Sequence, residues 1–148
     1  MKRGTAMLCL LVSVFTSSLA VSVEAQEGDR GRAESAAVGF LKAFDQGDLR
    51  PAYRERAGKS LKQTVTEEAF VAQFSIARGQ LGGPGSGRQV IDERPLTQLP
   101  NTPLRGTFYF FRYKTRHPVG NVYEDIYLEK EGDGAWKIVG SWFNPAPE

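Results

Sequence analysis

The sequence predicts an α+β fold in which N-terminal helices pack on one face of a curled, cone-like antiparallel sheet of about four strands. Up to residue 81 the apolar residues recur at helical spacing, and beyond it they alternate as in strands. The Gly-rich stretch GGPGSG, residues 82–87, separates the two halves. Helices followed by a run of strands are typical of an α+β domain. We therefore expect a single domain over residues 33–144, with a short tail at 145–148.

Three helices are expected in the first half of the domain. The first starts at Ala33, carries its apolar residues at i, i+3, i+4 and i+7, and ends at Gly47. A short second helix covers 49–57, and Thr66 is placed to cap the third. The stripe of the first helix comprises Ala33, Ala36, Ala37, Phe40, Leu41 and Phe44, and that of the third comprises Phe70, Phe74, Ala77 and Leu81.

Four strands are expected in the second half, because alternating segments are separated by turn-rich stretches. In the last hairpin, a three-residue loop with a left-handed Gly134 places Leu128 on one face with Trp136 and Trp142. Both tryptophans then point toward the helices. A two-residue loop is the alternative, but it mixes Leu128 with Lys137 on one face. The expected strands are 88–96, 107–115, 122–131 and 135–143.

The N-terminus has the pattern of a secretory signal peptide over residues 1–25. Lys2 and Arg3 precede an apolar run at 6–15, and small residues lead to a cleavage site after Ala25, with Ala20 as the alternative site. A transmembrane anchor is disfavoured because hydroxyl groups dilute the apolar run. We expect an exported protein, periplasmic or secreted, without a stable membrane anchor, whose residues 26–32 form a flexible leader.

The composition excludes several kinds of site. The only cysteine, Cys9, lies in the predicted signal peptide, and the chain has a single histidine, so disulfides, thiol catalysis and transition-metal sites are not expected. Positive and negative charges are interspersed, which argues against nucleic-acid binding. We expect no cofactor.

Several short motifs follow one another along the chain: A-x-x-F-L-x-x-x-D-x-G-D at 37–48, R-x-x-L-G at 78–82 and DG-x-W-x-x-x-G at 133–140. Their order resembles an uncharacterised family of exported bacterial proteins, domain of unknown function 4019. The resemblance covers about 33–143 and implies export without an established activity. Tyr53 and Phe70 depart from the pattern, since tryptophan is usual at both positions. The order of helices and strands is also similar to cystatin-like and nuclear-transport-factor-like cones.

Glu124 is the most distinctive candidate site residue. It falls on the face of its strand that carries Ile126 and Leu128, where a carboxylate needs a partner. Arg78 or Arg112 could supply an ion pair. Alternatively, Glu124 is the general base of an isomerase or dehydratase-like enzyme, with Tyr109, Tyr113 or Asp45 as its acid or oxyanion donor.

A non-catalytic binding module is the preferred reading, because no catalytic motif is present. Its ligand would be a small apolar molecule or a partner protein, held in the concave pocket or on the outer face of the sheet. His117, before a proline in a turn, is expected to be exposed. Phe108 and Phe110 lie on one face of their strand, and Tyr109, Phe111 and Tyr113 lie on the other. Both faces are apolar, so the outer one needs cover, either from a second copy or partner protein or from the leader or the loop 99–106. The expected ligand-binding residues are Tyr53, Arg78, Arg112, Glu124 and Trp142.

Overall fold

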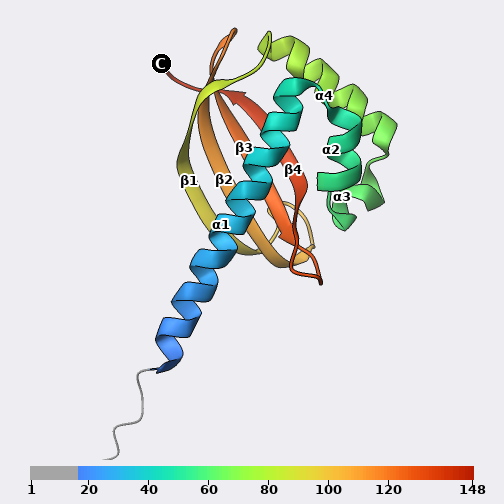
Figure 1. The fold of residues 1–148 in the computed structure, drawn as a ribbon. Coiled ribbons are helices and arrows are strands. Elements are labelled where there is room, and N and C mark those ends of the chain that lie inside the picture. The colour runs from blue at the N-terminus through green and yellow to red at the C-terminus, as the bar shows by residue number, and fades with distance from the viewer. Residues whose placement is uncertain (1–16) are drawn as a thin grey trace, which may run out of the picture.

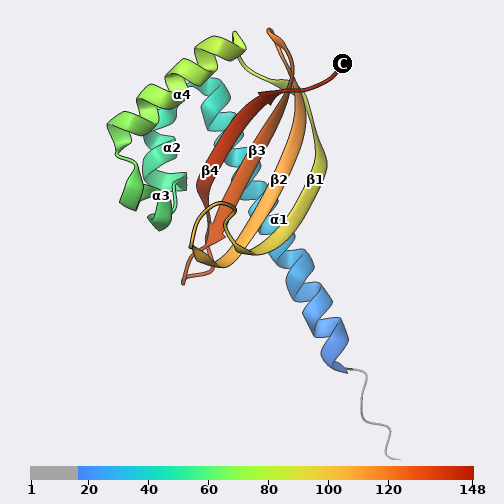
Figure 2. The ribbon, with the colours of Figure 1, turned by 180° about the vertical axis from the view of Figure 1, so that it is seen from behind.

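The computed structural model describes the backbone of residues 17–148 and the side chains of residues 26–148, and it has the expected α+β architecture. The helices lie together on one side of an antiparallel sheet that does not close on itself, with strand order β1-β2-β3-β4 (Figures 1 and 2). Most of the predicted signal peptide lies outside the described residues. The elements are α1 (Ser17–Gln46), α2 (Leu49–Arg56), α3 (Lys59–Thr64), α4 (Glu67–Leu81), β1 (Ser86–Gln98), β2 (Arg105–His117), β3 (Gly120–Lys130) and β4 (Trp136–Pro145).

Helix α1 lies across the concave face of the sheet (Figure 1). Its predicted apolar stripe is buried, and Gly47, with a φ of 80°, ends it as expected. Residues 26–32, expected as a flexible leader, instead continue this helix. Asp29 accepts a hydrogen bond of 2.7 Å from Lys130 of β3, and Arg30 is paired with Glu93 of β1 at 2.8 Å. These ion pairs hold residues 29 and 30 of α1 against the sheet.

Helix α4 begins and ends where the sequence predicts. The Oγ1 of Thr66 accepts a hydrogen bond from the Ala69 amide at 3.2 Å, and Gly82 ends the helix in the left-handed conformation. The short helix α3 was not expected. Leu61 is its only large apolar residue, so it has no apolar stripe that a sequence pattern could reveal.

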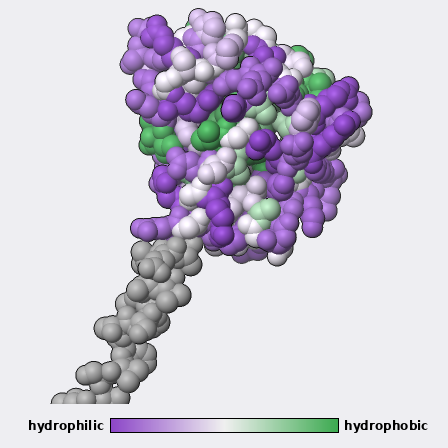
Figure 3. Space-filling view, in the orientation of Figure 1, coloured by the Kyte–Doolittle hydropathy of each residue, from purple (hydrophilic) through white to green (hydrophobic). Residues whose placement is uncertain are grey.

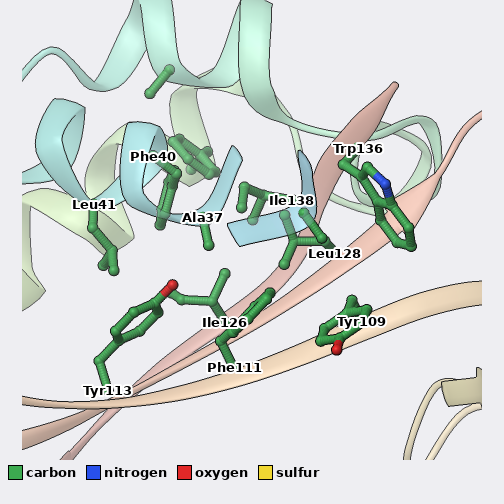
Figure 4. Close-up of a cluster of buried hydrophobic side chains, with 13 residues drawn as sticks. Ala37, Phe40, Leu41, Tyr109, Phe111, Tyr113, Ile126, Leu128, Trp136 and Ile138 are labelled. Atoms are coloured by element: carbon green, nitrogen blue, oxygen red, sulfur yellow. The ribbon is translucent and has the colours of Figure 1, made fainter. Parts of the chain in front are cut away.

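The main core lies between α1 and the concave face of the sheet. Side chains from β2, β3 and β4 meet the stripe of α1 there (Figure 4). This layer is continuous with aromatic residues of α4, whose Phe70 and Phe74 contact Phe40. Its labelled members are Ala37, Phe40, Leu41, Tyr109, Phe111, Tyr113, Ile126, Leu128, Trp136 and Ile138.

The hairpin of β3 and β4 confirms one part of the predicted register and corrects another. Gly134 is left-handed, and Leu128 pairs with Ile138, so Trp136 points toward the helices and is 7% exposed. A bulge at Val139 then shifts the register, so that Tyr127 pairs with Gly140.

The bulge places Trp142 on the outer face of the sheet. Trp142 pairs with Asp125, is 53% exposed and packs edge-on against Tyr127 with ring centroids 5.2 Å apart. The prediction that Trp142 faces the helices is therefore wrong. Phe143 points inward instead and stacks on Phe44 of α1 at 4.7 Å. The physical reason is that one extra residue in a strand exchanges the two faces for every residue beyond it.

The outer face of the sheet finds its cover within the chain. Phe108 and Val139 form a buried cluster with Leu99, which comes from the loop 99–106. Phe110 lies under the guanidinium of Arg94, 4.6 Å from its ring centroid. The loop alternative accounts for this burial, so the apolar pattern of β2 gives no argument for a homodimer.

Candidate functional site

A buried charged cluster joins the end of α1 to three strands. Glu124 of β3 is 0% exposed, and its carboxylate accepts hydrogen bonds from Arg88 Nε at 2.5 Å and Arg88 Nη2 at 2.9 Å. Thr115 Oγ1 donates to the same carboxylate at 2.7 Å, and Nε2 of His117 lies 3.0 Å from it. Arg88 also donates to Asp45 at 3.1 Å.

The hydrogen bonds determine the charge state of the cluster. Burial acts to raise the pKa of Glu124, but the hydrogen bonds and charge of Arg88 outweigh it, with help from Thr115 and His117, so this pKa lies below its ordinary value. The two nitrogens of His117 face the Glu124 carboxylate and the carbonyl oxygen of Gly83 at 3.1 Å.

The structure corrects two expectations about this cluster. Neither Arg78 nor Arg112 is the partner of Glu124. Arg112 lies on the outer face and donates to Asp125 at 2.6 and 2.7 Å, whereas Arg78 donates to the carbonyl oxygen of Asp45 at 3.0 Å.

His117 is not exposed in a loop but buried, at 3% exposure. The hairpin that carries it folds back onto the end of α4, where the Val119 amide donates to the carbonyl oxygen of Leu81 at 3.3 Å. One sequence signal could have identified Arg88 as the partner of Glu124. Arg88 follows directly after the Gly-rich turn, at the start of the strand that precedes β2 and β3.

The two tyrosines predicted to assist Glu124 lie outside its hydrogen bonds. Hydrogen bonds join the Glu124 carboxylate to Arg88, Thr115 and His117, and none joins it to Tyr109 or Tyr113 within residues 26–148. Tyr109 stacks on Phe111 in the core at 4.8 Å. The hydroxyl of Tyr113 is buried without a hydrogen-bond partner, and burial raises the pKa of this phenol well above its ordinary value.

A hollow lies elsewhere, between α4 and the end of β4; we call it the α4–β4 groove. Its volume is about 450 Å³, within the range of small-molecule sites. Phe74 and Phe143, both partly buried, line it, and so does Trp142, which is 53% exposed. The residues that line it are Gln73, Phe74, Ala77, Gln80, Leu81, Val119, Asn121, Val122, Ser141, Trp142, Phe143, Asn144 and Pro145.

The α4–β4 groove is distinguished by its charge. None of its lining residues is charged, although 24% of the residues in the chain are. By contrast, the face of the molecule seen in Figure 3 is mostly hydrophilic, with small hydrophobic areas between polar residues. An uncharged, partly apolar hollow on such a surface is a candidate binding site.

A second hollow of about 380 Å³ lies on the outer face, beside the loop 99–106. Trp142 and Asn144 line both this hollow and the α4–β4 groove. The end of β4 thus has a hollow on either side.

Of the residues predicted to bind a ligand, only Trp142 lines the groove. Tyr53 packs on Phe70 and donates a hydrogen bond of 2.6 Å to the carbonyl oxygen of Val65, so it supports the junction of α2 and α4. Arg78, Arg112 and Glu124 lie in the ion pairs and hydrogen bonds described above. Sequence reasoning missed the contribution of α4, because a helical stripe does not reveal which of its residues border a space.

Neither a metal site nor a membrane span is found in the described part of the chain. No three side chains among His, Cys, Asp and Glu are grouped there so as to hold a metal ion, and none of the described helices combines the length and apolar character needed to cross a membrane.

Comparison with known proteins places the chain in a sequence family. The family model described as "Protein of unknown function (DUF4019)" matches residues 36–141, which include all of the charged cluster and much of the groove. No curated protein and no solved structure matches the chain.

Proposed function

Because the chain belongs to the DUF4019 family of proteins of unknown function, we propose its function from its own surface. We infer that it is an exported, non-catalytic binding module, which takes a small apolar ligand or an apolar segment of a partner protein into the α4–β4 groove. The observation that carries this proposal is the uncharged lining of a groove of about 450 Å³, which includes the exposed Trp142.

The chemistry of the groove favours binding over catalysis. Aromatic and aliphatic side chains that line it gain free energy when a ligand displaces water from them, roughly 25 cal/mol per Å² of apolar area. Gln73, Gln80 and Asn121 can donate or accept hydrogen bonds in the groove. No titratable side chain is available there to move a proton.

The alternative, an enzyme with Glu124 as general base, finds less support. A base that works near neutral pH needs a carboxylate with a raised pKa and a free lone pair. Glu124 has a lowered pKa and is fully occupied by Arg88, Thr115 and His117.

Export rests on the N-terminal sequence. Lys2, Arg3 and the apolar run 6–15 form the pattern of a signal peptide, and cleavage after Ala25 would leave every described ion pair intact, because the first of them involves Asp29. The mass of the protein recovered from the periplasm tests this part of the proposal. A mass that includes residues 1–25 contradicts it.

Binding of the neutral apolar dye Nile red tests the groove. We expect saturable dye fluorescence with the periplasmic protein and at least tenfold weaker binding with Ala77→Asp, which places a carboxylate in the groove. The matched control is Ile76→Asp, because Ile76 is exposed on the same helix and does not line the groove. Equal dye binding by both variants contradicts the proposal. Native mass spectrometry of the same protein then reports any molecule that it carries from the cell.

A further inference from the structure

The free edge of β4 forms one wall of the α4–β4 groove. We propose that the natural occupant is an extended, uncharged peptide segment of a partner protein, which pairs with this edge as an added strand. The inference rests on the proposed function and names the class of ligand for the same site.

The backbone of β4 offers free hydrogen-bonding groups at this edge. The Ala146 amide donates to the carbonyl oxygen of Asn121 at 2.9 Å, which makes Val122 and Pro145 a non-hydrogen-bonded pair. Such pairs alternate with hydrogen-bonded pairs in antiparallel strands. The N–H and C=O groups of Ser141 and Phe143 therefore point away from β3, toward the open side.

Another part of the chain already pairs with this edge of β4, at Ile138. The Gly58 amide donates to the carbonyl oxygen of Ile138 at 2.8 Å, and Ala57 forms a parallel bridge with the same residue. Beyond Ile138, β4 has no neighbouring strand on this side within residues 17–148. The edge accepts backbone partners, and the stretch from Ser141 to Pro145 remains open.

The lining of the groove shows that it follows the strand. Five consecutive residues of β4, 141–145, border it. Side chains on one face of a strand would contribute alternate residues only. A space bordered by every residue runs along the edge of the strand, with α4 as its opposite wall. An extended chain matches this shape, since five residues in a strand span about 15 Å at roughly 3.3 Å per residue.

The two hollows beside β4 suit the side chains of an added strand. Successive side chains of such a strand point to opposite faces of the sheet, one toward the α4–β4 groove and the next toward the hollow beside loop 99–106. Trp142 and Asn144 border both hollows. The groove has no charged wall, and Asp125, the one charged residue that lines the other hollow, is already paired with Arg112, so the segment that fits both is uncharged. The hydroxyl of Ser141 is buried without a partner and offers one further hydrogen bond.

The test is displacement of Nile red from the periplasmic protein by a panel of blocked, uncharged hexapeptides that alternate threonine or serine with valine, leucine or phenylalanine. Each peptide is compared with a version N-methylated on its two central residues, which blocks backbone pairing at both edges of the peptide. We expect a peptide of the panel to displace the dye and its N-methylated form to bind at least tenfold more weakly. Ser141→Pro removes an amide from the edge of β4 and should weaken binding of the unmethylated peptide at least tenfold, in a variant whose circular dichroism spectrum matches that of the native protein.

The outcomes separate this inference from the proposed function. Dye binding without displacement by any peptide at millimolar concentration overturns the peptide segment and leaves the apolar groove standing, whereas absence of dye binding overturns both. Equal affinity of native and N-methylated peptides also overturns strand pairing, and it does so without any variant protein. Sedimentation tests whether a second copy of the chain occupies the edge instead. A dimer that binds no peptide and that Ser141→Pro dissociates would assign the edge to that second copy.

Discussion

Arg88 and Glu124 form a bidentate ion pair in the interior, with the Nε of Arg88 2.5 Å from one carboxylate oxygen and its Nη2 2.9 Å from the other. Arg88→Met would leave Glu124 buried without its main counter-charge. We expect a loss of about 3–5 kcal/mol in the free energy of unfolding. Urea unfolding followed by circular dichroism measures it. The control is Arg54→Met, because Arg54 is exposed in a surface ion pair with Glu67, and a change of at most about 1 kcal/mol is expected there.

The lowered pKa of Glu124 predicts acid sensitivity with a defined sign. A carboxyl whose pKa is lower in the folded protein contributes stability above its unfolded value, here about 4.5, and that contribution is lost as the pH falls through the folded value. Between pH 7 and pH 3 the free energy of unfolding should therefore fall more steeply in the native protein than in Glu124→Gln. Parallel slopes in the two proteins below pH 4.5 would refute the assignment.

The two tryptophans should differ in their accessibility to a quencher. Trp142 is 53% exposed and Trp136 is 7% exposed. In Trp136→Phe the remaining Trp142 should be quenched by acrylamide several-fold more strongly than Trp136 is in Trp142→Phe. Equal quenching would contradict the bulge at Val139, since that bulge alone places Trp142 on the outer face.

Gly85 lies against the charged cluster, and a Cβ there would be 2.5 Å from the Thr115 methyl group and 2.9 Å from the His117 ring. Gly85→Ala should lower the free energy of unfolding by about 1–3 kcal/mol, because those side chains must shift. Gly132→Ala is the matched control, since a Cβ at Gly132 meets no atom within 4 Å. Thermal unfolding of both variants measures the difference. Similar midpoints would show that the turn at Gly85 accommodates the added methyl group without loss of stability.

The cap of α4 should be worth about 1 kcal/mol, which is typical for a side chain that satisfies a first-turn amide. Thr66→Ala removes the bond to the Ala69 amide and should destabilise by this amount. Thr66→Ser keeps the hydroxyl and should retain most of the stability in chemical denaturation. A serine variant as unstable as the alanine variant would mean that the threonine methyl group, not the cap, matters.

Patterns that repeat within one element could be predicted from the sequence. The buried stripe of α1, the cap at Thr66 and the left-handed Gly134 follow from local spacing and local chemistry, and all three are found. The fold class follows from the order of such elements. The DUF4019 resemblance is confirmed by the family match.

Features that depend on two distant elements could not be predicted. The bulge at Val139 leaves no strong local signature, yet it exchanges the faces of Trp142 and Phe143. The pairing of Glu124 with Arg88 depends on the conformation of the turn after α4, which sets the position of Arg88. His117 is buried because a hairpin folds back onto that same turn. The α4–β4 groove is a space left between two elements, so no single stretch of sequence encodes it.

The position of α1 at the start of the fold has a consequence for synthesis. Its Phe44 stacks on Phe143, so the helix and the last strand that it contacts are separated by about 100 residues of chain. A ribosome that adds roughly 5–20 residues per second needs roughly 5–20 s to make that stretch. During this interval the apolar stripe of α1 has no finished sheet to cover it. Nascent chains that stall before β4 therefore expose this stripe, and chaperones that hold apolar helices would bind them at α1.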